Sequence, residues 1–180
     1  MEIASDKRHR DLLSKLLDER MSLDSEIKRK GIYHLEYYYN HYGQRGFIDL
    51  LEIQNNTTRP VIDIYEVKPS LENLGEAMRQ LNRALDAIKK IGLSGVPHSY
   101  TKSIRLILVT ELCSKNYNII IECKPMLINT NIAILLNFNN EWGHFFPCIY
   151  EEYDLDYIES LNRLVLQLKY KNTVKFLQDG

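Results

Sequence analysis

Three charged side chains in the first half of the sequence could together bind a metal ion and hydrolyse a phosphate ester. Glu66 and Lys68 lie two positions apart at the end of the apolar run VIDIYEVK, and Asp49 lies seventeen residues before Glu66 within GFIDLLEI. Strand alternation places residues i and i+2 on one face, so Glu66 and Lys68 would point the same way. Burial of Asp49 among its apolar neighbours costs free energy unless the carboxylate is paired or binds a cation.

A hard divalent cation would remove that cost. The carboxylates of Asp49 and Glu66, with a backbone carbonyl and water, are ligands that suit Mg²⁺ or Mn²⁺. Such an ion turns a bound water into a nucleophile and neutralises charge that develops on a phosphate. Lys68 would orient that water or stabilise the transition state as a compact positive charge. We therefore predict that Asp49, Glu66 and Lys68 are catalytic residues.

The same residues also have a purely structural interpretation. Glu66 and Lys68 could form an ordinary ion pair at a strand end, and Asp49 could cap a turn. The Glu-x-Lys spacing is weak as a signal, because it occurs again at Glu122 and Lys124. That second triplet has no preceding acid comparable to Asp49, and we interpret it as an ion pair on a strand edge.

Hydrophobic periodicity predicts the elements that position these residues. Apolar residues at steps of three and four predict helices over about 7–30, 69–92 and 154–176, with Ser70 as the N-cap of the second helix. Runs rich in β-branched and aromatic residues predict strands at 32–42, 47–54, 61–68, 103–112, 117–124 and 131–138. The polar segment 55–60 favours an antiparallel hairpin, which would place Asp49 in the strand beside Glu66.

Composition limits the class of protein. The 180 residues are 44% hydrophobic and 26% charged, which is typical of one globular domain. Three cysteines without CxxC spacing indicate neither a disulfide framework nor a zinc site. A charged N-terminal segment and the lack of a long apolar run predict a soluble, cytoplasmic protein without a membrane span. The net charge of -1 does not by itself indicate nucleic acid, although a local basic groove would suffice.

The motifs FIDLL and YEVKP, followed by an amphipathic helix, resemble those of the PD-(D/E)xK nuclease superfamily. The resemblance covers residues 5–112 or so, in the order helix, three strands, helix, strand. It implies a single α/β domain over residues 1–180. The domain would have a restriction-endonuclease-like core, with a central mixed sheet flanked by helices. Additional strands and a long C-terminal helix over about 113–180 would elaborate it.

The function that this resemblance implies is a divalent-metal-dependent deoxyribonuclease, a hydrolase that cuts phosphodiester bonds in DNA by attack of an activated water. Mg²⁺ or Mn²⁺ would be the cofactor, held by Asp49, Glu66 and the backbone carbonyl of Val67. We favour an endonuclease with a role in restriction, defence, recombination or mobile elements. The alternative is a catalytically inactive protein of the same fold that binds nucleic acid or assembles with other proteins. A third possibility is an interaction module unrelated to nucleases.

Two parts of the family pattern differ in this sequence. Ile48 stands where the proline that names the motif would precede the first aspartate. Many members also use a glutamate of the first helix as an additional metal ligand. Glu19 and Glu26 are candidates, Glu36 in the tyrosine-rich segment is a third, and we prefer Glu26 because it lies nearer the helix end.

Other residues are candidates for binding DNA. Arg79 and Arg83 lie on one helix face and could contact a phosphate backbone, although a solvated helix face explains them as well. Gln80 matches the glutamine of an exonuclease-like branch of the superfamily, but Ala84 replaces the tyrosine of that branch. The tyrosines of the segment 33–42 could stack on unpaired bases or pack against helices or a second subunit. We expect DNA as the partner, a homodimer, and no small-molecule cofactor.

Overall fold

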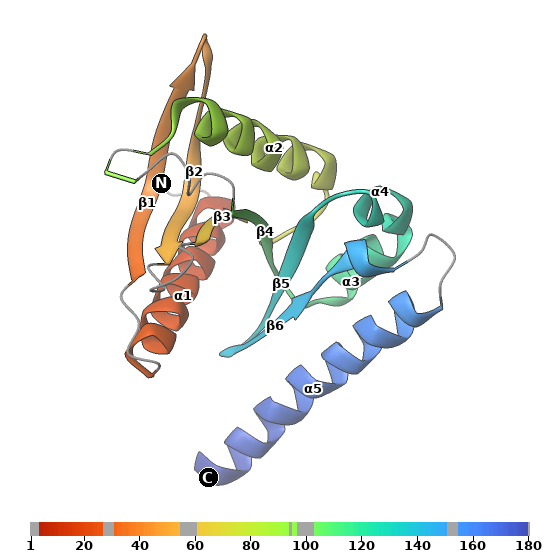
Figure 1. Ribbon diagram of the computed structural model, residues 1–180. Coiled ribbons are helices and arrows are strands. Elements are labelled where there is room, and N and C mark those ends of the chain that lie inside the picture. Colours follow the sequence, from red (N-terminus) through yellow and green to blue (C-terminus); the bar gives the residue numbers. More distant parts are fainter. Residues whose placement is uncertain are drawn as a thin grey trace.

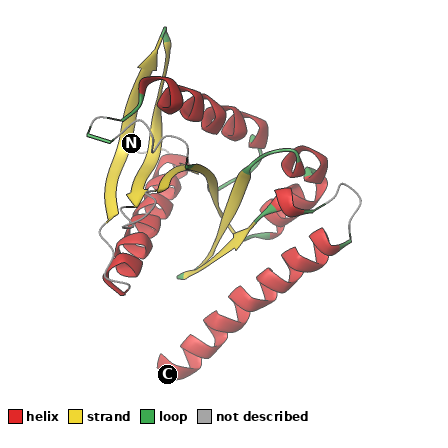
Figure 2. Cartoon of the chain, viewed as in Figure 1, coloured by secondary structure: helices red, strands yellow, loops and turns green. Residues whose placement is uncertain are grey.

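The computed structural model describes residues 4–26, 31–54, 61–93, 95–96, 103–150 and 155–179. In these ranges a six-stranded mixed sheet is flanked by helices, and a long helix ends the chain (Figure 1). The distribution of helices and strands is that of a mixed α/β protein (Figure 2). The polar segment 55–60 lies outside the described residues.

The described elements begin in the predicted order of helix, three strands, helix and strand. They are α1 (Ala4–Glu26), β1 (Gly31–His41), β2 (Gln44–Gln54), β3 (Val61–Val67), α2 (Leu74–Ile91) and β4 (Ile104–Glu111). The chain continues through α3 (Ser114–Glu122), α4 (Lys124–Ile128), β5 (Ile132–Phe138), β6 (Glu141–Phe145), a short 3-10 helix η2 (Pro147–Ile149) and α5 (Asp156–Asp179).

The six strands lie in the sheet in chain order. β1 pairs antiparallel with β2, and β2 pairs antiparallel with β3. β3, β4 and β5 are parallel to one another, and β6 is antiparallel to β5. The predicted hairpin of β2 and β3 is therefore confirmed. Its register pairs Leu50 with Tyr65 and Gln54 with Val61, so β2 leaves β3 immediately before Leu50.

Helices cover both faces of the sheet. One core joins α2 to β1–β6 and includes the buried side chains of Ile48, Ile64, Leu81, Leu108 and Leu136. The other core lies under α1 and includes Leu12, Leu16, Leu50, Tyr65 and Val109. Because Ile64 and Tyr65 are neighbours in β3 yet belong to different cores, the alternation of the central strand buries both of its faces.

β1 and β2 continue together past the rest of the sheet as a two-stranded arm over residues 37–48 (Figure 1). The arm begins where Glu36, with φ of 50°, stands between the paired positions Leu35 and Tyr37. The faces exchange at this point, because Ile48 packs on the α2 side whereas Leu50 packs on the α1 side. A turn with positive φ at Tyr42 and Gly43 closes the arm, and two such residues match the twist of a hairpin.

Two predictions for the second half of the chain are wrong. Residues 117–124 are not a strand, because α3 ends at Glu122 and α4 begins at Lys124. The strand-edge ion pair proposed for this triplet is therefore also wrong. β4 and β5 are parallel, so the chain between them must return across the sheet, and a helical crossover makes that connection. This topology overrides the strand preference of the run of isoleucines.

The start of α2 and the extra strand β6 also differ from the predictions. The N-cap of α2 is Asn73 and not Ser70, whose hydroxyl instead accepts a hydrogen bond from the Glu72 amide at 3.5 Å. β6 was missed because it is short and contains Gly143. A Cβ at Gly143 would lie 2.5 Å from a methyl carbon of Leu164, so the glycine permits α5 to pack closely on β6.

α5 confirms the predicted long C-terminal helix. It packs on β5 and β6 through one face, where Tyr157, Leu161 and Leu168 are buried. Its other face exposes Tyr170 and Leu177. No helix in the described ranges is long and apolar enough to cross a membrane.

Candidate active site

The candidate site forms where β2 leaves β3. Asp49 is the last residue before the paired segment of β2, and its Oδ2 accepts a hydrogen bond of 2.7 Å from the Val67 amide. The carboxylate therefore takes a position that a ladder carbonyl would otherwise occupy, at the carboxyl end of β3. Glu66 and Lys68 flank Val67, so the structure brings together the three residues that the sequence singled out.

Glu66 is a buried acid with a perturbed proton affinity. Burial is the largest cause, and the negative charge of Asp49 adds to it, so the pKa of Glu66 rises from 4.5 to about 7. Lys68 opposes the rise, since its Nζ lies 3.1 Å from Glu66 Oε1. The Glu66 side chain is 8% exposed and that of Lys68 is 32% exposed. The site therefore holds two neighbouring carboxyls with one ammonium on the solvent side.

His9 of α1 belongs to the same cluster, and sequence reasoning missed it. Its Nε2 lies 3.2 Å from Asp49 Oδ2. That hydrogen bond to Asp49 raises the pKa of His9, while its partial burial acts in the opposite direction. The available signal was helical spacing, because His9 shares the apolar face of α1 with Leu12, Leu13 and Leu16. A polar residue on that face must meet a partner from the sheet.

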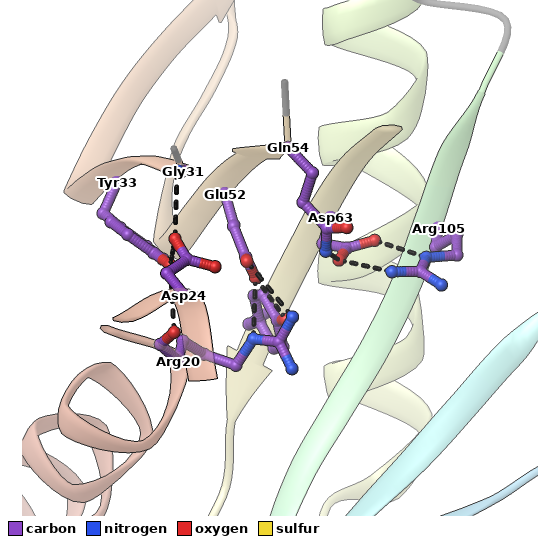
Figure 3. A network of polar contacts seen from close by, with 9 residues as sticks. Arg20, Asp24, Gly31, Tyr33, Glu52, Gln54, Asp63 and Arg105 are labelled. Atoms are coloured by element: carbon purple, nitrogen blue, oxygen red, sulfur yellow. Dashed lines mark hydrogen bonds and ion pairs between the residues drawn. The ribbon is translucent and has the colours of Figure 1, made fainter. Parts of the chain in front are cut away.

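A network of polar contacts joins the second half of α1, the helix that carries His9, to the sheet (Figure 3). Arg20 donates two hydrogen bonds to the carboxylate of Glu52, at 3.0 and 3.2 Å, and Tyr65 donates a third at 2.7 Å. Near the helix end, Asp24 accepts from the Gly31 amide at 3.0 Å and from the Tyr33 hydroxyl. These contacts fix the second half of α1 against β1, β2 and β3.

The same network continues to β4. Arg105 donates to both oxygens of Asp63 at 2.6 and 2.7 Å, and Gln54 donates to Oδ2 of Asp63 at 2.6 Å (Figure 3). A cavity of about 590 Å³, lined in part by Arg20 and Arg105, lies beside these residues. Glu52 and Asp63 each have an arginine fork as partner, and Asp24 bonds to the Gly31 amide and the Tyr33 hydroxyl. We therefore interpret the network as structural, in contrast to Glu66, whose ion-pair partner is one partly exposed lysine.

The donor atoms at Asp49 and Glu66 fit a hard divalent cation. Among the described residues, no three His, Cys, Asp or Glu side chains converge as a ready-made metal cage. The site instead offers two carboxylates and the Val67 carbonyl, and Mg²⁺ typically binds one or two carboxylates and keeps several waters. The repulsion between the two acids is the feature that a cation would relieve, since Asp49 raises the pKa of Glu66.

The structure does not bring Glu26 to this cluster. Glu26 is the last residue of α1, about 25 Å along the helix from His9 at 1.5 Å per residue. Glu19 lines a surface cavity with Lys15 and Trp142. Of the three candidate glutamates, Glu36 lies across from Asp49 in the β1–β2 pair. Its neighbours Leu35 and Tyr37 pair with Leu50 and Ile48, the two residues that flank Asp49.

The predicted DNA-binding residues lie on α2, which covers the face of the sheet opposite to α1. Arg79 and Arg83 are exposed, and both pair with Glu76, at 2.9 and 3.1 Å. Gln80 Oε1 is buried and has no hydrogen-bond partner among the described residues. Tyr39 is buried in the core shared with α2; burial raises the pKa of its hydroxyl, Arg83 opposes the rise, and Glu66 adds to it.

Comparisons with known proteins add little at this level of similarity. No protein-family model matches the chain, and no curated protein matches it. A crystal structure of an fdxN element excision controlling factor from Anabaena variabilis is similar over 74% of this chain and 96% of that chain, with 11% sequence identity and a TM-score of 0.45. Such a likeness carries no argument about the fold family or the function of this chain.

Proposed function

We propose that the chain is a divalent-metal-dependent deoxyribonuclease with the restriction-endonuclease-like core of the PD-(D/E)xK superfamily. One observation carries the proposal. The hydrogen bond from the Val67 amide to Asp49 sets this acid beside the buried Glu66, and Lys68 completes the group. A second acid beside a buried carboxyl with a raised pKa, next to a lysine, supports a functional site, because perturbed carboxyls cluster at such sites.

Asp49, Glu66 and the Val67 carbonyl would hold the metal. When bound, Mg²⁺ or Mn²⁺ supplies an activated water and charge neutralisation on the phosphate. Lys68 contributes a mobile positive charge that can leave Glu66 and meet the phosphate or the water, because its side chain is partly exposed. His9 orients the Asp49 carboxylate by holding the oxygen that also accepts from Val67.

The alternative function is a binding or assembly protein that keeps this fold without catalysis. The observation that favours it is the 3.1 Å ion pair of Lys68 and Glu66, which gives each charge a partner within the protein. The two functions differ in one measurable way. A binding protein does not need the second acid at Asp49, whereas a metal-dependent nuclease loses activity without it.

Cleavage assays distinguish the two functions. Wild type, Asp49→Asn and Lys68→Ala are incubated with plasmid, linear, branched and single-stranded DNA in Mg²⁺, Mn²⁺ or EDTA. Glu122→Gln is the matched control, because Glu122 also precedes a lysine by two positions but is exposed on α3. We expect metal-dependent cleavage by wild type and the control, and a loss of at least about a hundredfold in both site variants. Equal cleavage by all four proteins, or none by any, contradicts the proposal.

A further inference from the structure

The two-stranded arm carries an exposed aromatic pair close to the candidate site. Tyr38 and Phe47 are directly opposite each other in β1 and β2, and their ring centroids lie 5.3 Å apart with an interplanar angle of 53°. Their exposed fractions are 50% and 63%. The next pair, Asn40 and Arg45, is also exposed. We call these four residues the outer face of the arm.

The outer face belongs to the same side of the sheet as α1. The inner face of the arm packs toward α2, where Tyr39 and Ile48 are buried, so the outer face points away from α2. His9 in the first turns of α1 contacts Asp49, and Asp49 follows Phe47 by two residues. A strand rises about 3.4 Å per residue, which places Phe47 roughly 7 Å from Asp49 along β2.

The arm itself carries no acidic side chain that would repel a polyanion. Residues 37–48 contain no aspartate or glutamate, and they include Arg45 and His41. The neighbouring start of α1 exposes Lys7, Arg8 and Arg10 together with Asp6 and Asp11, and Glu36 at the base of the arm is also exposed. A phosphodiester that reaches Asp49 and Glu66 from this side therefore meets no opposing carboxylate on the arm.

The aromatic patch is too small for a stable interface with a second protein and has the size of one or two bases. Two aromatic side chains bury at most about 300–500 Å². A stable protein interface needs roughly 800 Å² from each partner. The flat face of one or two bases matches the patch, and stacking on aromatic side chains requires that those bases be free of their neighbours in a duplex.

We propose that Tyr38 and Phe47 stack on an unpaired base close to the scissile phosphate, so that the preferred substrate is DNA with a single-stranded segment at the cut. This inference rests on the proposed nuclease function and specifies its substrate class. In duplex DNA consecutive phosphates of one strand are about 3.4 Å apart along the axis, so Phe47 stands one or two nucleotides from the phosphate at Asp49. Arg45 contacts the backbone of the same strand, without regard to base pairing.

Binding assays in EDTA separate stacking from catalysis. Fluorescence anisotropy measures the Kd for a blunt duplex and for the same duplex with a single-stranded overhang. We expect wild type to prefer the overhang, and Phe47→Ala or Tyr38→Ala to weaken overhang binding at least about fivefold with little change on the blunt duplex. Tyr170→Ala removes another exposed ring, 70% exposed on α5, and is the control.

A second variant gives a direct signal and guards against misfolding. Phe47→Trp keeps a stacking ring, so we expect near wild-type affinity and quenching of the new tryptophan emission by the overhang but not by the blunt duplex. The background is the single native tryptophan, Trp142. Equal affinity of Phe47→Ala and wild type for the overhang overturns the inference. So does a change in oligomeric state with DNA binding unaltered, because the patch would then join two copies.

Failure of this inference differs from failure of the nuclease proposal. If Asp49→Asn loses Mg²⁺-dependent cleavage but Phe47→Ala keeps the substrate preference of the wild type, the protein is a nuclease that does not use base stacking. If Phe47→Ala loses overhang binding and no substrate is cleaved, the aromatic pair stacks on bases in a binding protein. The proposal that stacking occurs at a cleavage site is then wrong.

Discussion

Substitution of Glu66 by glutamine should stabilise the metal-free protein at neutral and alkaline pH. The pKa of Glu66 is raised from 4.5 to about 7, mainly by burial and then by Asp49. A carboxyl with a raised pKa in the folded state stabilises the fold while it is protonated, and this contribution is lost as the pH rises through 4.5 to 7. Because each factor of ten in proton affinity is about 1.4 kcal/mol, the ionised acid lowers the free energy of unfolding by about 3 kcal/mol.

Urea unfolding in EDTA at pH 4.5 and at pH 8, followed by the fluorescence of Trp142, measures this effect. Glutamine resembles the protonated acid, so the advantage of Glu66→Gln over wild type should grow by about 3 kcal/mol between the two pH values. The exposed Glu122→Gln serves as the control and should change stability by less than about 0.5 kcal/mol at either pH. An advantage that is the same at both pH values would refute the account of Glu66 as an acid destabilised by burial and by Asp49.

Two further predictions concern the residues that support the site. His9→Ala should lower kcat/KM for DNA cleavage by about 10- to 100-fold, because loss of its hydrogen bond leaves the Asp49 carboxylate misoriented. Steady-state kinetics measure the effect, and a circular dichroism spectrum checks that the variant is folded. Unchanged kinetics contradict the prediction. Arg20→Met leaves Glu52 buried without its fork and should cost about 3–5 kcal/mol in urea unfolding, against less than about 0.5 kcal/mol for the exposed Arg79→Met.

The sequence predicted most of the framework because its signals were local. Alternation and a short polar segment were enough to predict the β2–β3 hairpin, and the hairpin alone predicts that Asp49 lies beside the end of β3. The parts that failed depend on long-range structure. The isoleucines of α3 favour a strand by propensity, and only the parallel pairing of β4 with β5 requires a helix there.

The contact of His9 with Asp49 and the two-stranded arm also depend on long-range structure that the local sequence does not predict. Nothing in the residues near His9 names Asp49 as its partner, because the contact depends on how the Arg20 and Asp24 bonds orient α1. The arm depends on the exchange of faces near Glu36, a residue whose type does not indicate positive φ. The preference for Glu26 assumed that the C-terminal end of α1 lies near Asp49 and Glu66. In the structure the N-terminal part of α1, which carries His9, lies there instead.

Metal binding tests the central claim most directly, because the account requires Asp49 and Glu66 to share one cation. Titration of the protein with Mn²⁺, followed by the electron paramagnetic resonance signal of the free ion, counts the bound ions without any substrate. The account predicts binding to wild type and to Glu122→Gln, and loss of that binding in both Asp49→Asn and Glu66→Gln. Absence of binding to the wild type, or equal binding by all four proteins, would contradict it.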